Sequence, residues 1–145
     1  MTSMHPGLLW AAAGLLVAGC GTPVEMGQVE GTVRAGGQPL SGVLVTFIPT
    51  HEVPGGVIRS MGKTDGQGRY RLQAENQQDG AVVGQHQVIV EDLAIYSAPR
   101  DADGTVTQLP PERVPQAYSD LLQTKLQREV QPGEQTIDLD LTASP

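Results

Sequence analysis

Residues 126–141 have the sequence LQREVQPGEQTIDLDL, in which two alternating segments flank a turn. In the second segment Leu139 and Leu141 alternate with Asp138 and Asp140. Successive side chains of a β-strand point to opposite faces, so this period of two predicts a strand with one buried face and one solvent-exposed face. Because the intervening Gln-Pro-Gly-Glu has turn chemistry, the stretch predicts a closing β-hairpin.

The same period of two recurs along the upstream chain. It predicts five more strands, at residues 29–34, 43–48, 57–63, 70–72 and 86–92. The segments GGQP at 36–39 and TDGQG at 64–68 combine glycine with proline or aspartate, so each predicts a tight turn within a β-hairpin. Seven short strands, with no long stretch of helical period, predict an all-β sandwich.

Several side chains can be assigned to an environment from these patterns. Leu40 and Phe47 are expected in the core of the sandwich. Asp65 is expected to accept backbone N–H bonds that hold its own loop. His86 opens its strand and is expected at the surface or half-buried.

One long connection, residues 93–117, separates the fifth strand from the closing stretch and contains four of the eleven prolines. The only plausible helical turn is at 116–123. A connection of this length is typical either of a functional loop or of a mobile one. Tyr96 and Tyr118 are the candidate contacts for a ligand or partner, because exposed aromatic rings offer a platform for recognition.

Length and charge restrict the class of protein. The 145 residues suffice for one domain. A single cysteine excludes an intramolecular disulfide. The net charge of −7 comes from 9 basic and 16 acidic residues, and none of these lies before Cys20. Phosphate contacts require clustered Lys or Arg, so we expect no binding to nucleic acid.

The N-terminal region contains an uncharged apolar run that ends at Cys20. Its twelve residues, 8–19, would reach only about 18 Å as a helix, which is short of a bilayer core of roughly 30 Å. The ending Val-Ala-Gly-Cys resembles the bacterial lipobox, in which the cysteine is lipidated and becomes the first residue after cleavage. The resemblance implies a signal peptide at 1–19, a tether at 20–27 and a domain at 28–142.

Two features qualify this interpretation. Residues 1–7 lack Lys and Arg, whereas signal peptides usually begin with a positive flank. A free cysteine beside an ordinary cleavage site and a cytosolic thiol therefore stay open as alternatives for Cys20. Gly21 follows the cysteine where an aspartate would resemble an inner-membrane retention signal, which favours the outer membrane of a cell with two membranes.

The strand and turn motifs resemble the carboxypeptidase regulatory-like domains. The motifs are VEGTV (29–33), GQPLSGV (37–43), FIP (47–49), TDGQGRY (64–70) and GQHQV (84–88). VPQAYSD (114–120) and VQPG (130–133) are similar to the form of this domain found in planctomycete lipoproteins. The resemblance implies a transthyretin-like, immunoglobulin-like β-sandwich. It implies a fold more than an activity, because one fold can serve many functions.

Residues with catalytic chemistry are sparse. His51 and His86 are the only histidines after Cys20, and no serine lies in a Gly-x-Ser-x-Gly motif. No cluster of His or Cys has the spacing of a zinc site. Intradiol dioxygenases, which share the transthyretin-like architecture, bind iron through closely spaced Tyr and His residues, and that motif is absent. We therefore expect no enzyme activity and no cofactor.

Calcium is the best metal candidate. Asp101 and Asp103 offer two carboxylates beside a turn glycine, and Asp65 or Asp79 could add a third. The segment lacks the terminal bidentate Glu of a full calcium loop, which favours an ordinary solvated turn.

The sequence thus predicts an exported, lipid-anchored domain that acts without catalysis in the cell envelope. A structural role, or binding of an envelope protein at a strand edge or at the 93–117 connection, is the leading hypothesis. A glycan-binding module on the cell surface is the alternative.

Overall fold

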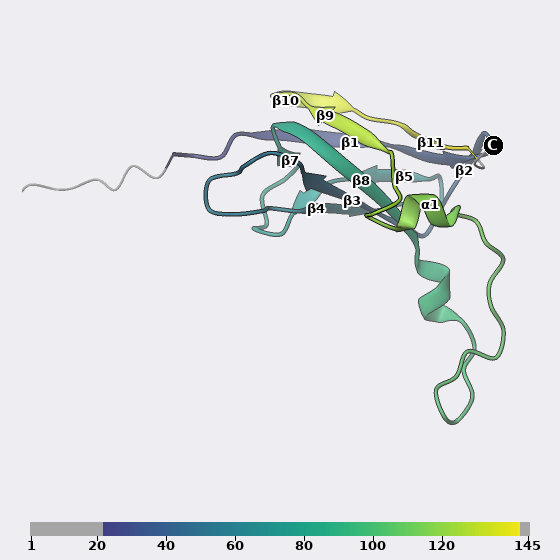
Figure 1. The fold of residues 1–145 in the computed structure, drawn as a ribbon. Helices are drawn as coiled ribbons and strands as arrows, with labels where there is room; N and C mark the ends of the chain where they lie inside the picture. The colour runs from purple at the N-terminus through teal and green to yellow at the C-terminus, as the bar shows by residue number, and fades with distance from the viewer. Residues whose placement is uncertain (1–21, 143–145) are drawn as a thin grey trace, which may run out of the picture.

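A computed structural model describes residues 22–142 of the chain. The predicted signal peptide, residues 1–19, and Cys20 lie outside the described residues. Within 22–142 the chain forms two β-sheets packed face to face, with a long excursion at one end (Figure 1). The all-β sandwich predicted from the period of two is confirmed at this level.

The first sheet is built around one long strand, β1 (Met26–Ala35). It is a mixed sheet, because three short strands pair with β1 antiparallel and two pair with it in parallel. The antiparallel partners are β2 (Gln38–Pro39), β5 (Arg69–Arg71) and β7 (Ala81–Val82). The parallel partners are β10 (Gly133–Thr136) and β11 (Leu139–Leu141).

The second sheet is antiparallel throughout, in the order β6-β4-β3-β8-β9. Its centre is β3 (Val43–Pro49) paired along seven residues with β8 (Gly84–Asp92). The outer strands are β4 (Ser60–Lys63), β6 (Gln73–Ala74) and β9 (Gln127–Val130). Two short helices lie outside the sheets, the 3₁₀ helix η1 (Leu93–Ser97) and α1 (Gln116–Ser119). None of the helices within 22–142 has the length and apolarity needed to cross a membrane.

The core lies between the sheets and follows the period of two. Alternate residues of β1, β3 and β8 are buried, whereas most of the residues between them are partly or fully exposed. Phe47 is fully buried and Leu40 is 7% exposed, as expected. Val114 returns to this core from the 93–112 excursion.

Tyr70 of β5 reaches past Gly31 of β1, so that its buried side chain links two segments of the first sheet. Its hydroxyl donates a hydrogen bond of 2.6 Å to the carbonyl of Ile137. Two glycines leave room for the ring, because an added Cβ at Gly31 or Gly62 would lie 3.1 or 3.3 Å from ring carbons of Tyr70. Beside it, the Asp138 carboxylate accepts the backbone N–H of Thr32 at 2.8 Å. These side-chain hydrogen bonds add to the backbone bond from the Ile137 N–H to the Glu30 carbonyl, 2.7 Å, where β10 ends and β11 has not yet begun.

The predicted pairings of successive long strands are wrong. The turn at 36–37 folds the chain back into the short strand β2, which pairs with β1, but the chain then crosses to β3 in the second sheet. The turns at 64–68 and 131–133 lie on paths between the sheets, from β4 to β5 and from β9 to β10. Glycines with positive φ permit these sharp changes of direction; Gly68 has a φ of 76° and packs against the carbonyl of Val33. Alternation specifies which face of a strand is buried and not which strand lies beside it.

The expected count of seven strands is also wrong, because the described residues form eleven. Strands coincide with all seven predicted segments, although only 60–63 of the predicted 57–63 is a strand. The four additional strands, β2, β6, β7 and β10, contain two to four residues each. Segments this short contain too few residues to establish a period.

Candidate functional site

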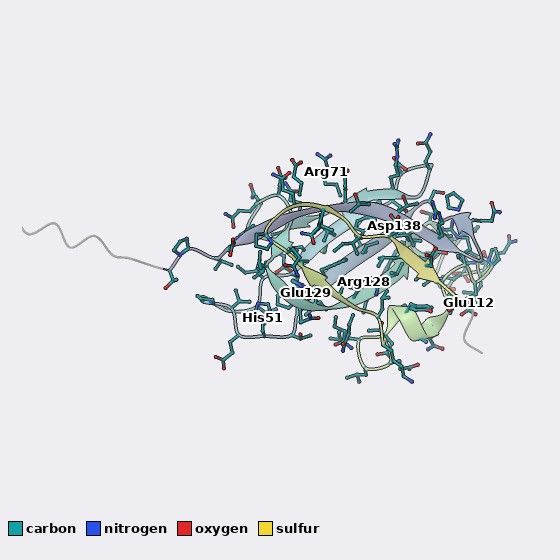
Figure 2. The ribbon with its side chains drawn as sticks, turned by 90° about the horizontal axis from the view of Figure 1, so that it is seen from above. His51, Arg71, Glu112, Arg128, Glu129 and Asp138 are labelled. Atoms are coloured by element: carbon teal, nitrogen blue, oxygen red, sulfur yellow. The ribbon has the colours of Figure 1, made fainter. Side chains whose placement is uncertain are left out.

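A groove on the outer face of the first sheet offers a candidate binding site. It has a volume of about 380 Å³, and its floor is formed by residues 28–30 of β1. One wall contains Arg71, Asp79 and Gly80, and the other is residues 134–136 of β10. This volume lies in the range of small-molecule sites, roughly 300–1,000 Å³. Figure 2 looks down on this face, with Arg71 on one side of β1 and Asp138 on the other.

The backbone of both walls is fixed, one by β-pairing to β1 and the other by a hydrogen bond and close packing. On one side, Glu134 lies opposite Gln28 in the parallel register of β10. On the other, the N–H of Gly80 donates to the carbonyl of Leu72 at 2.8 Å, and an added Cβ at Gly80 would lie 2.0 Å from the carbonyl oxygen of Gly27. The walls are therefore held at a set separation without any ligand.

The charges of the groove are mostly negative. It is lined by Glu30, Asp79 and Glu134 and by a single cation, Arg71, so its formal charge is −3 + 1 = −2. Arg71 forms an exposed ion pair of 3.0 Å with Glu30. Within residues 22–142, no ion pair involves Asp79 or Glu134. Two carboxylates therefore face the cavity without a compensating charge.

A second cavity of about 390 Å³ continues the groove along β1 and shares Glu30, Arg71 and Thr136 with it. Its far end is the loop of Asp65. The Asp65 carboxylate accepts the backbone N–H groups of Arg69 and Gln67, which hold the pKa of that carboxyl below its ordinary value. The predicted role of Asp65 in holding its own loop is confirmed.

The loop of Asp101 repeats the geometry of the Asp65 loop. The Asp101 carboxylate accepts the backbone N–H groups of Asp103 and Thr105 at 3.0 and 2.9 Å. Gly104, with a φ of 82°, corresponds to Gly68. One carboxylate oxygen of Asp101 is thus engaged by backbone donors, as in an ordinary Asx-type turn. Asp79 and Asp65 belong to the first-sheet groove instead, and no group of three metal-binding side chains forms within the described residues.

The excursion, residues 93–112, leaves the sandwich at the end of β8 and is closed at its neck by an ion pair. Arg113 donates through Nε to Asp92 at 2.8 Å and through Nη2 to the other carboxylate oxygen, and its Nη1 donates to the carbonyl of Ser41 at 3.0 Å. Asp92 also caps η1 by accepting the N–H of Ala94. The expected long loop thus contains ordered structure, including a bridge between Arg100 and Val106.

Burial alone would raise the pKa of the Asp92 carboxyl. The hydrogen bonds from Arg113 and Ala94, together with the guanidinium charge, outweigh burial and hold the pKa below its ordinary value. The hydrogen bond to Asp92 and the charge of that carboxylate raise the pKa of Arg113. The neck therefore stays ionised and paired at neutral pH.

The two candidate tyrosines have different environments. Tyr96 lies in η1 and is 68% exposed. Tyr118 packs against the core, and its hydroxyl donates to the carbonyl of Thr142 at 3.1 Å. Only Tyr96 therefore has the exposure expected of a contact residue. Leu109, 73% exposed, adds an apolar side chain to the excursion.

His86 is fully buried, which corrects its expected place at the surface. The period of two along β8 puts it on the inward face with Val88, and its ring lies 5.7 Å from that of Phe47. Its Nδ1 lies 3.0 Å from the carbonyl of Gly84, whereas Nε2 has no hydrogen-bond partner in the described part of the chain. Burial lowers the pKa of His86, and the neighbouring His51 adds to this. A neutral imidazole in the core is the result.

The groove itself was not predicted from the sequence, which named Asp79 only as a possible calcium ligand. The alternation of Glu30 with valine and glycine did indicate that it lies on the solvent-exposed face of β1. Asp79 and Glu134 lie in turn-rich segments without periodicity, so no pattern assigns them to one face. No family model matches the chain, and no curated protein or solved structure matches it either.

Proposed function

We propose that this chain is an exported lipoprotein, anchored through a lipid on Cys20, whose sandwich acts as a non-catalytic interaction module in the cell envelope. The lipobox-like ending at residues 17–20 supports the anchor, and the carboxypeptidase regulatory-like domain is the family we assign to residues 28–142. In this proposal the excursion is the element that contacts a partner protein.

One observation carries the proposal: the two ends of the excursion are held together by the ion pair between Asp92 and Arg113. The Asp92–Arg113 pair is bidentate, and the two side chains are only 16% and 33% exposed. A connection without a role needs no such device, since surface loops of this length tolerate disorder. The neck holds Tyr96 and Leu109 on an ordered projection rather than on a free coil.

The geometry of the tether supports the same proposal. β8 begins at Gly84, beside Val130, which lies against Gly27 near the start of β1. It ends at Asp92, eight residues or about 26 Å farther along the sandwich. Figure 2 places His51 near the start of β1 and Glu112 at the opposite end.

Five residues separate Cys20 from the start of β1 at Met26, so the tether spans at most about 21 Å. The end of the sandwich that contains the start of β1 would then lie next to the membrane. The excursion would lie at the far end, where a partner in the envelope can reach it.

Site-specific photo-crosslinking in intact cells tests the excursion. A crosslinking residue in place of Leu109 should capture one envelope protein, and the same residue in place of Asn76, near the start of β1, should not. Equal labelling patterns at both positions, or no adduct at Leu109, would refute the excursion as the contact element.

The glycan-binding alternative rests on Tyr96, because Tyr118 is packed against the core. A glycan array read with the wild-type chain and with Tyr96→Ala separates the two proposals. Binding that Tyr96→Ala abolishes would favour the glycan module over a protein partner.

A further inference from the structure

We propose that the groove between Asp79 and Glu134 is a binding site for an organic cation, an alkylammonium or guanidinium group such as the end of a lysine or arginine side chain. This site is separate from the excursion and does not depend on the lipid anchor. Three features of the first sheet carry the inference: the shape of the groove, its charge and the rigidity of its walls.

The shape favours an organic group. The cavity of about 380 Å³ is elongated over β1, with Asp79 on one wall and Glu134 on the other. The two carboxylates belong to different elements and lie across the groove rather than on one segment. A ligand that reaches both must be larger than a single ion.

The charge favours a cation that also offers hydrogen-bond acceptors. Glu30 is already paired with Arg71, which leaves Asp79 and Glu134 as the carboxylates of the groove without an ion pair among residues 22–142. Arg71 is 76% exposed and retains donors that Glu30 does not use. An ammonium group between the carboxylates, with a carbonyl near Arg71, satisfies both signs of charge.

The aromatic content argues for charge recognition over stacking. No aromatic residue lines the cavity between Asp79 and Glu134. Tyr70 lines only the adjoining cavity, and its hydroxyl is engaged by Ile137. Sugar stacking and cation–π contacts thus have no platform here.

Because the walls of the groove are rigid, its solvent-exposed carboxylates can bind a cation without a cost for ordering the backbone. The β10 wall is paired with β1, and the opposite wall is held by the bridge between Asp79 and Gln73 and by the hydrogen bond from the Gly80 N–H to the Leu72 carbonyl, so binding requires no ordering of a loop. The site still opens to solvent, and each carboxylate is expected to contribute a few-fold to affinity rather than a hundredfold.

Fluorescence anisotropy on the full-length chain in neutral detergent tests the site, with a labelled trilysine amide as the probe. We expect saturable binding that is lost when the probe's lysines are acetylated. Asp79→Asn and Glu134→Gln should each weaken binding about two- to fivefold, and the double variant about tenfold. Thr136→Tyr, which fills the groove without changing its charge, should block binding.

Glu129→Gln is the matched control, because it removes one exposed carboxylate from β9 in the other sheet (Figure 2). A loss of affinity equal to that of Glu134→Gln would mean non-specific attraction to an acidic protein and would overturn the site. Spermidine should displace the probe; failure to do so would show that the peptide, and not its cationic group, is recognised. Melting temperatures confirm that each variant is folded.

Discussion

The hydroxyl of Tyr70 is the residue-scale feature that links β5 to the segment between β10 and β11, on the other side of β1. Burial raises the pKa of this hydroxyl above its ordinary value, the charge of Asp138 adds to the effect and that of Arg128 opposes it. The group therefore remains a donor to Ile137 at neutral pH. Its position requires the two glycines, Gly31 and Gly62, that flank the ring.

Tyr70→Phe keeps the ring and removes the hydrogen bond to Ile137. We expect the free energy of unfolding to fall by about 1–2 kcal/mol, because the carbonyl left behind is partly buried. Urea denaturation measures this change. Tyr96→Phe is the matched control, since that side chain is 68% exposed, and a loss of similar size in both variants would remove the special role of Tyr70.

His86 predicts a dependence of stability on pH. Burial lowers its pKa in the folded state, so the unfolded chain binds the proton more readily than the folded one. The contribution is fully present above the unfolded pKa of about 6.5 and is lost as the pH falls through that value towards the folded pKa.

Stability should therefore decrease on acidification from pH 7.5, with a slope of at most about 1.4 kcal/mol per pH unit from this group. His86→Leu should flatten the slope whatever its effect on absolute stability. Denaturation midpoints of the wild type and of His86→Leu, measured between pH 5 and 8, give the two slopes to be compared. An unchanged slope in His86→Leu would show that the buried imidazole is not responsible.

At the scale of elements, the neck of the excursion governs how often residues 93–112 open. Asp92→Asn removes the charge that binds Arg113 and should raise the rate of tryptic cleavage after Arg100 about tenfold, corresponding to about 1.4 kcal/mol. Limited proteolysis followed by mass spectrometry measures it. Glu30→Gln, which breaks the exposed pair with Arg71, should leave this cleavage unchanged; equal acceleration would contradict the role of the neck.

The strands show which features of the fold could be predicted from the sequence alone. Alternation located the main strands and the inward faces of β1, β3 and β8, because burial on one face is a local property of the chain. It failed on strand neighbours, since the turns at 36–39, 64–68 and 131–133 have the same chemistry whether a chain folds back or crosses to the other sheet. Partner choice is decided by packing over the whole core.

The candidate site was harder to predict for the same reason. The groove brings together residues 28–30, 79–80 and 134–136, which become adjacent only because β10 pairs with β1 and Gly80 packs against Gly27. His86 was predictable from its phase with Val88, but its polarity suggested the surface. The excursion was predictable as a long connection, whereas its neck depends on a contact between residues 92 and 113.

At the scale of the whole molecule, the proposed anchor would orient the sandwich and its excursion relative to the membrane. A lipid on Cys20 would place the start of β1 near the membrane and the excursion at the far end. The net charge of −7 would repel anionic headgroups, which keeps the domain upright on its tether rather than lying on the surface.

The lipid anchor on Cys20 is tested most directly by mass spectrometry of the N-terminal tryptic peptide from native membranes. The first basic residue after Cys20 is Arg34, so the account predicts a peptide of residues 20–34 that carries the mass of a diacylglyceryl group on the cysteine. Cys20→Ala should lose both the lipid mass and the cleavage before residue 20. An unmodified peptide of residues 1–34, or one that begins at another residue without lipid, would contradict the proposal.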